Sequence, residues 1–374
     1  MFSDNQKISD RQMQRLLIFD MLGISTLVLP GLLAKMIGKD GIFALGLALI
    51  PALLVVWLLE KGGSSLQEFC AHDWLKVPLC LFYGLEGILI GGYGVFLLGD
   101  MMVKNLVRDE SFYLVTGLLV LLAGYGIRQG MEARARIYEI LFWILLIPLL
   151  IMLLLASGDV DTNLWTPVVT HGWWSVGQGI IVAFLFYMIV AFAFFLKPYL
   201  VHPEHLGICC RRSLLVVVGI NCAIYLILLG IFGSGALAAM ETPIITLMSM
   251  VKLPGGFLER QDVFMVGIWF FALYALVNTG MFYASELTRT LWGKGNANLR
   301  IFCMMVLTML AAMGSYQVKG WNETLFWLQI WLVLPVSILL LAVVFVRNMR
   351  SAGGSCSQNE NGVHMKSEEE KGEK

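Results

Sequence analysis

Charged residues are scarce in this sequence. Asp, Glu, Lys and Arg make up 14% of the 374 residues, hydrophobic residues make up 58%, and the mean hydropathy is +0.78. A water-soluble particle of this length needs more polar surface, so the composition excludes a soluble globular fold. The net charge is zero and the basic residues are scattered between apolar blocks. No continuous basic face can form, which excludes nucleic acid as a partner.

Motifs for metal or redox chemistry are also lacking. The seven cysteines include no CxxC pair and mostly fall in or beside apolar segments, which is typical of reduced packing residues. The five histidines lie outside the apolar blocks, and the stretch from His202 to His205 has a proline and the wrong spacing for a metalloprotease helix. We therefore expect no metal, no cofactor and no enzymatic activity.

Long apolar runs are what the sequence does contain. A membrane-spanning helix needs about 20 apolar residues to cross about 30 Å of hydrocarbon. Because blocks of that size recur about ten times, we predict an all-α membrane protein surrounded by lipid. The expected spans are 16–36, 41–60, 78–103, 111–127, 138–157, 178–197, 213–236, 263–285, 300–315 and 324–346.

The positions of Lys and Arg predict the orientation, since cytoplasmic loops are enriched in them. If the N-terminus is cytoplasmic, most of these residues fall on the cytoplasmic side, so we expect both termini there and an even number of spans. Residues 1–15 then form a cytoplasmic segment, and 16–346 form a transmembrane permease-like domain. Residues 347–374 form a disordered cytoplasmic tail, because they have too few apolar residues to offset the entropy of ordering.

A long external segment, 158–177, divides the expected spans five and five. An odd number of spans in each half requires the second half to enter the membrane from the opposite side. This predicts an inverted repeat with halves of about 16–157 and 178–346. In transporters of this plan the first helix of each half is interrupted near the midplane, and its freed backbone groups bind substrate or ion.

The first span carries the residues that favour such an interruption. Gly23, Ser25, Thr26 and Pro30 lie where a helix should be most regular, and proline leaves a backbone group near Thr26 without its partner. One interpretation is a break that lines a ligand site; the other is a simple proline kink satisfied by Ser25 or Thr26. The sixth span is aromatic and has no internal glycine or proline, because Pro198 comes only at its end. We expect the sixth span to be unbroken.

Two acidic residues lie within the expected spans. A carboxylate inside a membrane costs about 2.5–3.5 kcal/mol, so Asp20 and Glu86 should face protein or water. Each is a possible proton or cation site, although Asp20 could lie in a polar cytoplasmic vestibule and Glu86 could be a buried, hydrogen-bonded acid. Small residues follow Glu86 and predict a central, tightly packed third span. They are Gly87, Gly91, Gly92 and Gly94.

Three uncharged polar residues lie in later spans. Asn221 falls in the seventh span, and Tyr274 and Asn278 fall in the eighth. They could line a ligand cavity, and Asn278 is a candidate ligand-binding residue. Hydrogen bonding between helices is the commoner use of such residues.

The chain resembles the spore germination permeases, the B subunits of nutrient germinant receptors, which belong to the amino acid–polyamine–organocation transporter superfamily. The resemblance covers nearly the whole chain and rests on the order of several motifs. They are Ile8 to Gln12, Gly23 to Pro30 followed by Gly31 to Ala34, Arg128 to Glu132, Arg136 to Ile140, and Leu164 to Pro167 with Gly172 and Gly179.

The resemblance implies a ten-helix inverted-repeat protein in the inner membrane of a dormant endospore, assembled with an A subunit and a lipoprotein C subunit. It also implies recognition of an amino acid or similar small nutrient, which triggers germination. The related transporters place the ligand's charged ends at the first helix, here Gly23, Ser25 and Thr26, against an aromatic wall, here Phe184 and Tyr187. The family often has Gly-x-Glu before the proline that closes the sixth span, whereas this chain has Ile-Val-Ala.

A second function fits the same fold. The chain could act alone as a secondary amino-acid transporter, driven by a proton or cation gradient through Glu86 or Asp20. The two functions differ in the consequence of ligand binding, which is a signal to partner subunits in one case and transport in the other.

Overall fold

The computed structural model describes residues 6–61, 73–105, 111–166, 171–250, 261–293, 295–318 and 335. Within these ranges the regular structure is helical, and one isolated β-bridge joins Ile8 to Leu200. The helices are α1 (Asp10–Ile37), η1 (Gly38–Asp40), α2 (Gly41–Leu47), α3 (Leu49–Lys61), α5 (Asp73–Asn105), α6 (Phe112–Arg128), α7 (Gly130–Ala156), η2 (Ser157–Asp159), η3 (Thr162–Trp165), α8 (Trp173–Tyr187), η4 (Met188–Tyr199), η5 (Pro203–His205), α9 (Leu206–Ala239), α10 (Pro243–Met250), α11 (Gln261–Trp292) and α12 (Ala297–Gln317).

The apolar helices confirm an all-α protein that crosses the membrane many times. Within the described residues, seven helical stretches are long and apolar enough to span a bilayer, and α6 is a shorter apolar helix. The first stretch, Asp10–Glu60, contains the first two expected spans. The tenth expected span, 324–346, lies outside the described residues. The total of ten membrane spans and their division into two halves of five therefore stay predictions.

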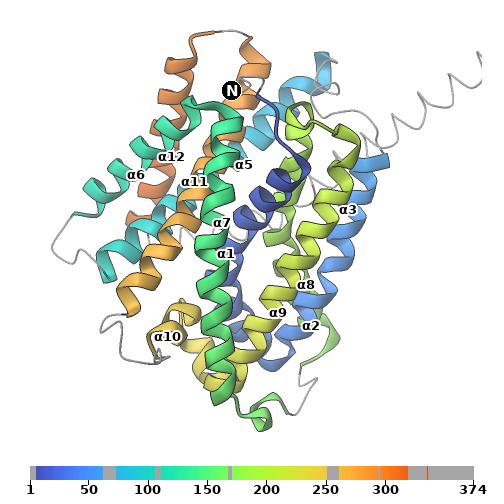
Figure 1. Cartoon of the computed structure of the whole chain (residues 1–374), viewed down its shortest axis with the longest axis vertical. Helices are drawn as coiled ribbons and strands as arrows, with labels where there is room; N and C mark the ends of the chain where they lie inside the picture. The colour runs from blue at the N-terminus through green and yellow to red at the C-terminus, as the bar shows by residue number, and fades with distance from the viewer. Residues whose placement is uncertain are drawn as a thin grey trace, which may run out of the picture.

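Helix α1 occupies the middle of the bundle. It packs most extensively against α9 and also contacts α11, α7 and α8. Figure 1 shows α1 between α3 on one flank and α6 and α12 on the other. Most of its residues are buried, polar ones included. A polar side chain on α1 therefore has to find its partner on the backbone of α1 or on a neighbouring helix.

The expected break in the first span is wrong for this structure. Helix α1 runs without interruption from Asp10 to Ile37 and includes Pro30. Because a proline has no N–H, the carbonyl of Thr26 receives no helical hydrogen bond. The simple alternative, a proline accommodated within one helix, is the arrangement found.

The expectation of a regular sixth span is also wrong. The α-helical geometry of α8 ends at Tyr187, and the chain continues as the 3-10 helix η4 for 12 residues. Runs of 3-10 helix longer than three or four residues are uncommon, and a stretch in mid-helix often marks a hinge or strain. One irregular element therefore lies in the sixth span, at a point where no adjacent glycine or proline indicates it.

A seam of glycines joins α5 to α11. These two helices have the most extensive contact of any described pair. A Cβ added at Gly87 would lie 2.8 Å from the carbonyl oxygen of Gly280, and one added at Gly280 would lie 2.8 Å from the backbone nitrogen of Gly91. Only glycine permits such a close approach of two backbones. The predicted tight packing of the third span is confirmed.

Candidate functional site

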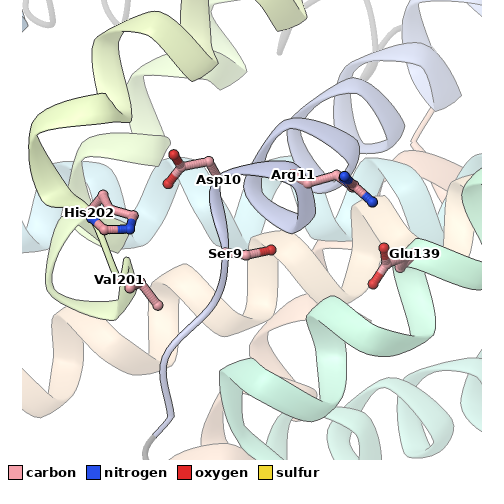
Figure 2. A pocket seen from close by; sticks show the side chains of 6 residues that line it. All are labelled: Ser9, Asp10, Arg11, Glu139, Val201 and His202. Atoms are coloured by element: carbon pink, nitrogen blue, oxygen red, sulfur yellow. The ribbon is translucent and has the colours of Figure 1, made fainter.

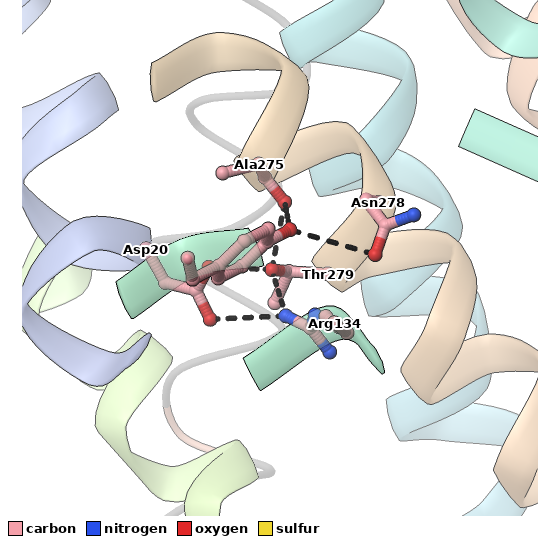
Figure 3. A network of polar contacts seen from close by, with 6 residues as sticks. Asp20, Arg134, Ala275, Asn278 and Thr279 are labelled. Atoms are coloured by element: carbon pink, nitrogen blue, oxygen red, sulfur yellow. Dashed lines mark hydrogen bonds and ion pairs between the residues drawn. The ribbon is translucent and has the colours of Figure 1, made fainter. Parts of the chain in front are cut away.

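A buried polar network connects three helices in the centre of the bundle. Asp20 of α1 is 1% exposed, and its Oδ2 lies 3.2 Å from Nη2 of Arg134 on α7. Its Oδ1 accepts a hydrogen bond of 2.6 Å from the hydroxyl of Thr279 on α11. Arg134 also donates to the Thr279 hydroxyl (Figure 3). Asp20 is thus neutralised by a fixed guanidinium inside the protein and does not lie in a water-filled vestibule.

Arg134 is the member of this network that sequence reasoning misses. The expected fifth span begins at residue 138, which leaves Arg134 in a cytoplasmic loop. Helix α7 instead begins at Gly130, and Arg134 is 3% exposed. Its guanidinium lies 5.0 Å from the ring centroid of Tyr138 and 5.1 Å from that of Phe282. The four-residue spacing from Arg134 to Tyr138 is the signal that places both on one face of a longer helix.

A second cluster joins α1 to α9 around Ser25. The hydroxyl of Ser25 donates to the carbonyl of Met21 at 2.7 Å, as a helical serine commonly does. It also accepts a 3.0 Å hydrogen bond from Nδ2 of Asn221. The Thr26 hydroxyl donates to the carbonyl of Leu22 at 2.6 Å. Ser25 and Thr26 are therefore buried and already hydrogen-bonded. The partner of Ser25 is Asn221, a residue whose position in the seventh span gives only a weak indication of this contact.

Two buried polar atoms beside this cluster have no hydrogen-bond partner. They are the hydroxyl of Tyr187, at the residue where α8 passes into η4, and Oδ1 of Asn221. The Tyr187 hydroxyl lies close enough to the Asn221 side chain for a weak interaction of the hydrogen-bond type, but the two groups do not reach full hydrogen-bond geometry. Phe184, one turn earlier on α8, is 5% exposed. An unpaired buried polar group costs about 1–3 kcal/mol, so leaving these two atoms without full partners is unfavourable.

Asn278 and Tyr274 connect helices. Nδ2 of Asn278 donates to the carbonyl of Ala123 on α6 at 3.1 Å, and Oδ1 accepts from Tyr138 of α7 at 3.4 Å. The Tyr274 hydroxyl donates to the carbonyl of Leu122 at 3.2 Å. These hydrogen bonds join neighbouring helices, which is the commoner use of such residues. Asn278 belongs to the network around Asp20 in Figure 3 and not to the Ser25 cluster.

Gly23 also has a packing role. A Cβ at this position would lie 2.9 Å from the carbonyl oxygen of Ala272. Helix α1 can approach α11 this closely only because Gly23 has no side chain. Gly23 thus seats α1 against Ala272 of α11, and its candidate ligand role stays a prediction.

Glu86 stands apart from both clusters. Its Oε2 atom is buried and has no hydrogen-bond partner. One of the two carboxyl oxygens of Glu86 thus has no partner among the described residues, and both interpretations of Glu86 stay predictions. An unpaired carboxylate inside a membrane span is a candidate functional group by default.

A cavity of about 370 Å³ opens at the start of α1. It is lined by Ser9, Asp10, Arg11, Glu139, Val201 and His202. Figure 2 shows Arg11 and Glu139 on one side of Ser9, and Asp10 with His202 on the other. Sixteen residues of helix separate Ser9 from Ser25, which corresponds to about 24 Å at 1.5 Å per residue. The cavity is therefore a separate feature from the Ser25 cluster.

Comparison with protein families shows which family this chain belongs to. A model of the family described as spore germination protein matches residues 7–318 of this chain. The chain belongs to this family. It is the B-subunit family of germinant receptors, a transporter-like family that is not known for enzymes.

Relatives of this spore germination protein occur in Bacillus subtilis (strain 168). Spore germination protein YndE is 24% identical over 300 residues, covering 77% of this chain and 81% of YndE. Spore germination protein KB is 28% identical over 180 residues, covering 45% of this chain and 47% of KB. Spore germination protein B2 is 23% identical over 228 residues, covering 59% of this chain and 61% of B2.

Solved structures show which fold this spore germination protein has. A substrate-bound, outward-open Na⁺-coupled sialic acid symporter matches with a TM-score of 0.55 and 14% identity, covering 85% of this chain and 76% of the symporter. An Eremococcus coleocola manganese transporter, in complex with an aromatic bis-isothiourea substituted compound, matches with a TM-score of 0.52 and 14% identity, covering 88% and 78%. The chain therefore has a LeuT-like transporter fold.

The motifs of this spore germination protein hold the N-terminal segment and α1 against α7. Nε2 of Gln12 donates to Glu139 at 3.2 Å. Gly130 has a φ of 81°, which favours glycine, and lets α7 begin where the side chain of Gln6 accepts from the backbone N–H of Met131 at 3.1 Å. The motifs around Gln12 and Gly130 thus position α1 against α7, whereas the motif from Gly23 to Pro30 contains Ser25 itself.

Proposed function

We propose that this chain is the nutrient-sensing, permease-like subunit of a spore germinant receptor. It binds an amino acid or a similar small molecule beside α1, and binding triggers germination through the A and C subunits. It resides in the spore inner membrane with both termini in the cytoplasm, and its ten spans form two inverted repeats.

The observation that carries this proposal is the pair of unpaired polar atoms around Ser25. The Tyr187 hydroxyl can donate to a carboxylate, and Oδ1 of Asn221 can accept from an ammonium group. The carbonyl of Thr26, left without a helical donor by Pro30, is a further acceptor for the ammonium end. The cluster thus offers both kinds of partner that a zwitterion needs.

The position of the cluster supports a role in signalling. Tyr187 is the last residue of α8, and η4 begins at the next residue. A ligand that pairs the Tyr187 hydroxyl interacts with the point where the backbone geometry changes. Ligand binding can then shift the equilibrium between two arrangements of the sixth span relative to α1, to the extent that it pairs better with one of them.

The test uses Tyr187→Phe, which removes the hydroxyl and keeps the ring. Spores that lack other germinant receptors express the variant together with the A and C subunits, and an equimolar mixture of the standard amino acids is titrated. Loss of one hydrogen bond of about 1 kcal/mol raises the half-effective concentration about fivefold. Tyr125→Phe is the matched control, because Tyr125 is 63% exposed on α6. An unchanged dose-response for Tyr187→Phe at normal protein level would refute the proposal.

A second candidate function, a stand-alone secondary amino-acid transporter, is favoured by Glu86. Its unpaired Oε2 is suited to hold a proton or cation during transport. Asp20 is less suited to that role because Arg134 already neutralises it. Uptake of labelled amino acids by the purified protein alone in liposomes, driven by an imposed proton gradient, would favour transport over sensing.

A further inference from the structure

The ion pair between Asp20 and Arg134 differs from the others in its burial. Their side chains are 1% and 2% exposed. Among the ion pairs in the described part of the chain, it is the one in which both side chains are buried this completely. Charges in such a place attract each other strongly because little water screens them, and separating them leaves each without compensation.

The network divides the helices around α1 into two groups. Bonds among α6, α7 and α11 join these three helices without α1: Tyr138 donates to the carbonyl of Ala275 at 3.0 Å, and Asn278 donates to that of Ala123 at 3.1 Å. On the opposite side, α9 holds α1 through Asn221. Asp20 is the buried polar tie between α1 and the α6–α7–α11 group.

Beside this tie, α1 and α11 meet at a contact to which α1 contributes no side chain, although Phe19 of α1 packs on Tyr138 of α7. Gly23, one turn after Asp20, seats α1 against Ala272 without any interlocking side chain of its own. Ser25 lies five residues from Asp20, which is about 7.5 Å along the helix. A displacement of α1 that begins at the Ser25 cluster therefore reaches the ion pair through rigid helix.

We propose that Asp20, Arg134 and Thr279 form a latch that holds α1 against α7 and α11 in the unliganded receptor and opens during the nutrient response. The latch sets how much nutrient is needed, because ligand binding has to supply the free energy that separates the pair. This inference rests on the proposed sensing function, since it assigns a regulatory role to the helix that carries Ser25.

The first test is conformational and does not depend on nutrient. The double variant Asp20→Asn with Arg134→Gln removes both charges and keeps groups able to hydrogen-bond. We expect amide hydrogen exchange of α1 in the purified protein to become faster, by about 5–150-fold, the usual range of coupling between sites. Exchange of α12 should not change. Unchanged exchange of α1 would overturn the latch whatever the protein senses.

The second test measures germination. Spores carrying the double variant and the A and C subunits should respond to the amino-acid mixture at a half-effective concentration lowered by about 5–150-fold, or germinate without nutrient. Arg15→Gln with Glu139→Gln is the matched control: this pair also joins α1 to α7, but its side chains are 17% and 31% exposed, so little change is expected.

Thr279→Val keeps the test decisive if the double variant does not accumulate. It leaves both charges in place and removes only the hydroxyl that donates to Asp20. We expect a smaller decrease of the half-effective concentration. A rise, or no change at normal protein level, would overturn the latch. If Tyr187→Phe fails its own test while α1 exchange is accelerated here, the sensing proposal fails and the structural tie stands.

Discussion

Replacing Gly87 by alanine tests the close contact between α5 and α11. The added Cβ would lie 2.8 Å from the carbonyl oxygen of Gly280 and 3.5 Å from the backbone nitrogen of Ala284. Both neighbours are backbone atoms of α11, so neither can rotate away. Overpacking of this kind costs about 1–3 kcal/mol. Alanine also gains up to about 1 kcal/mol of helix propensity over glycine, which partly offsets that cost.

Gly84→Ala provides the control that removes the propensity term. Gly84 lies one turn earlier on α5, and a Cβ there would meet nothing within 4 Å. The difference in unfolding free energy between the two variants therefore isolates the contact with α11 and should be about 1–3 kcal/mol. Unfolding of purified protein by increasing mole fractions of SDS, followed by circular dichroism, measures it. Equal midpoints for the two variants would refute a tight seam at Gly87.

Three further predictions concern individual side chains. Ser9→Ala should lower the free energy of unfolding by about 1 kcal/mol, because the Ser9 hydroxyl accepts from the N–H of Gln12 at the start of α1. Ser111→Ala should have little effect, because Ser111 caps α6 without a side-chain hydrogen bond. The same SDS titration measures both variants. Glu86→Gln should abolish proton-driven uptake in liposomes if the chain transports, and should leave germination intact if the chain only senses. Tyr187→Phe should raise the SDS midpoint slightly while weakening the nutrient response, since it removes an unpaired buried hydroxyl; a lower midpoint would contradict that assignment.

The membrane class of this protein can be predicted from sequence for a simple reason. The hydrocarbon core requires about 20 apolar residues per helix, and this requirement acts on every span independently of its neighbours. The glycines after Glu86 are informative for a similar reason. A row of small residues on one helix face has few uses other than close packing, and the seam with Gly280 is that packing.

The irregular backbone cannot be assigned by the same local reasoning. Pro30 marks a position where helical bonding is impaired, but whether a helix breaks there depends on what its neighbours supply, and α1 is packed on several sides. The change of geometry after Tyr187 has no glycine or proline to indicate it. It arises where α8 and η4 pack against other helices, and the local sequence does not contain that information.

The partners of the charged and polar residues were decided by tertiary structure. Composition and periodicity identify Asp20 as a carboxylate within a span, and they require that it face protein or water. They do not say that Arg134, 114 residues away, meets it. That pairing depends on α7 beginning at Gly130 and on the close approach of α1 to α11 at Gly23. The sequence alone determined that the chain is a many-span membrane protein with a few polar residues inside its spans, because each span needs its own apolar run. Only the packing of distant helices decided which of the described polar groups are paired and which have no partner.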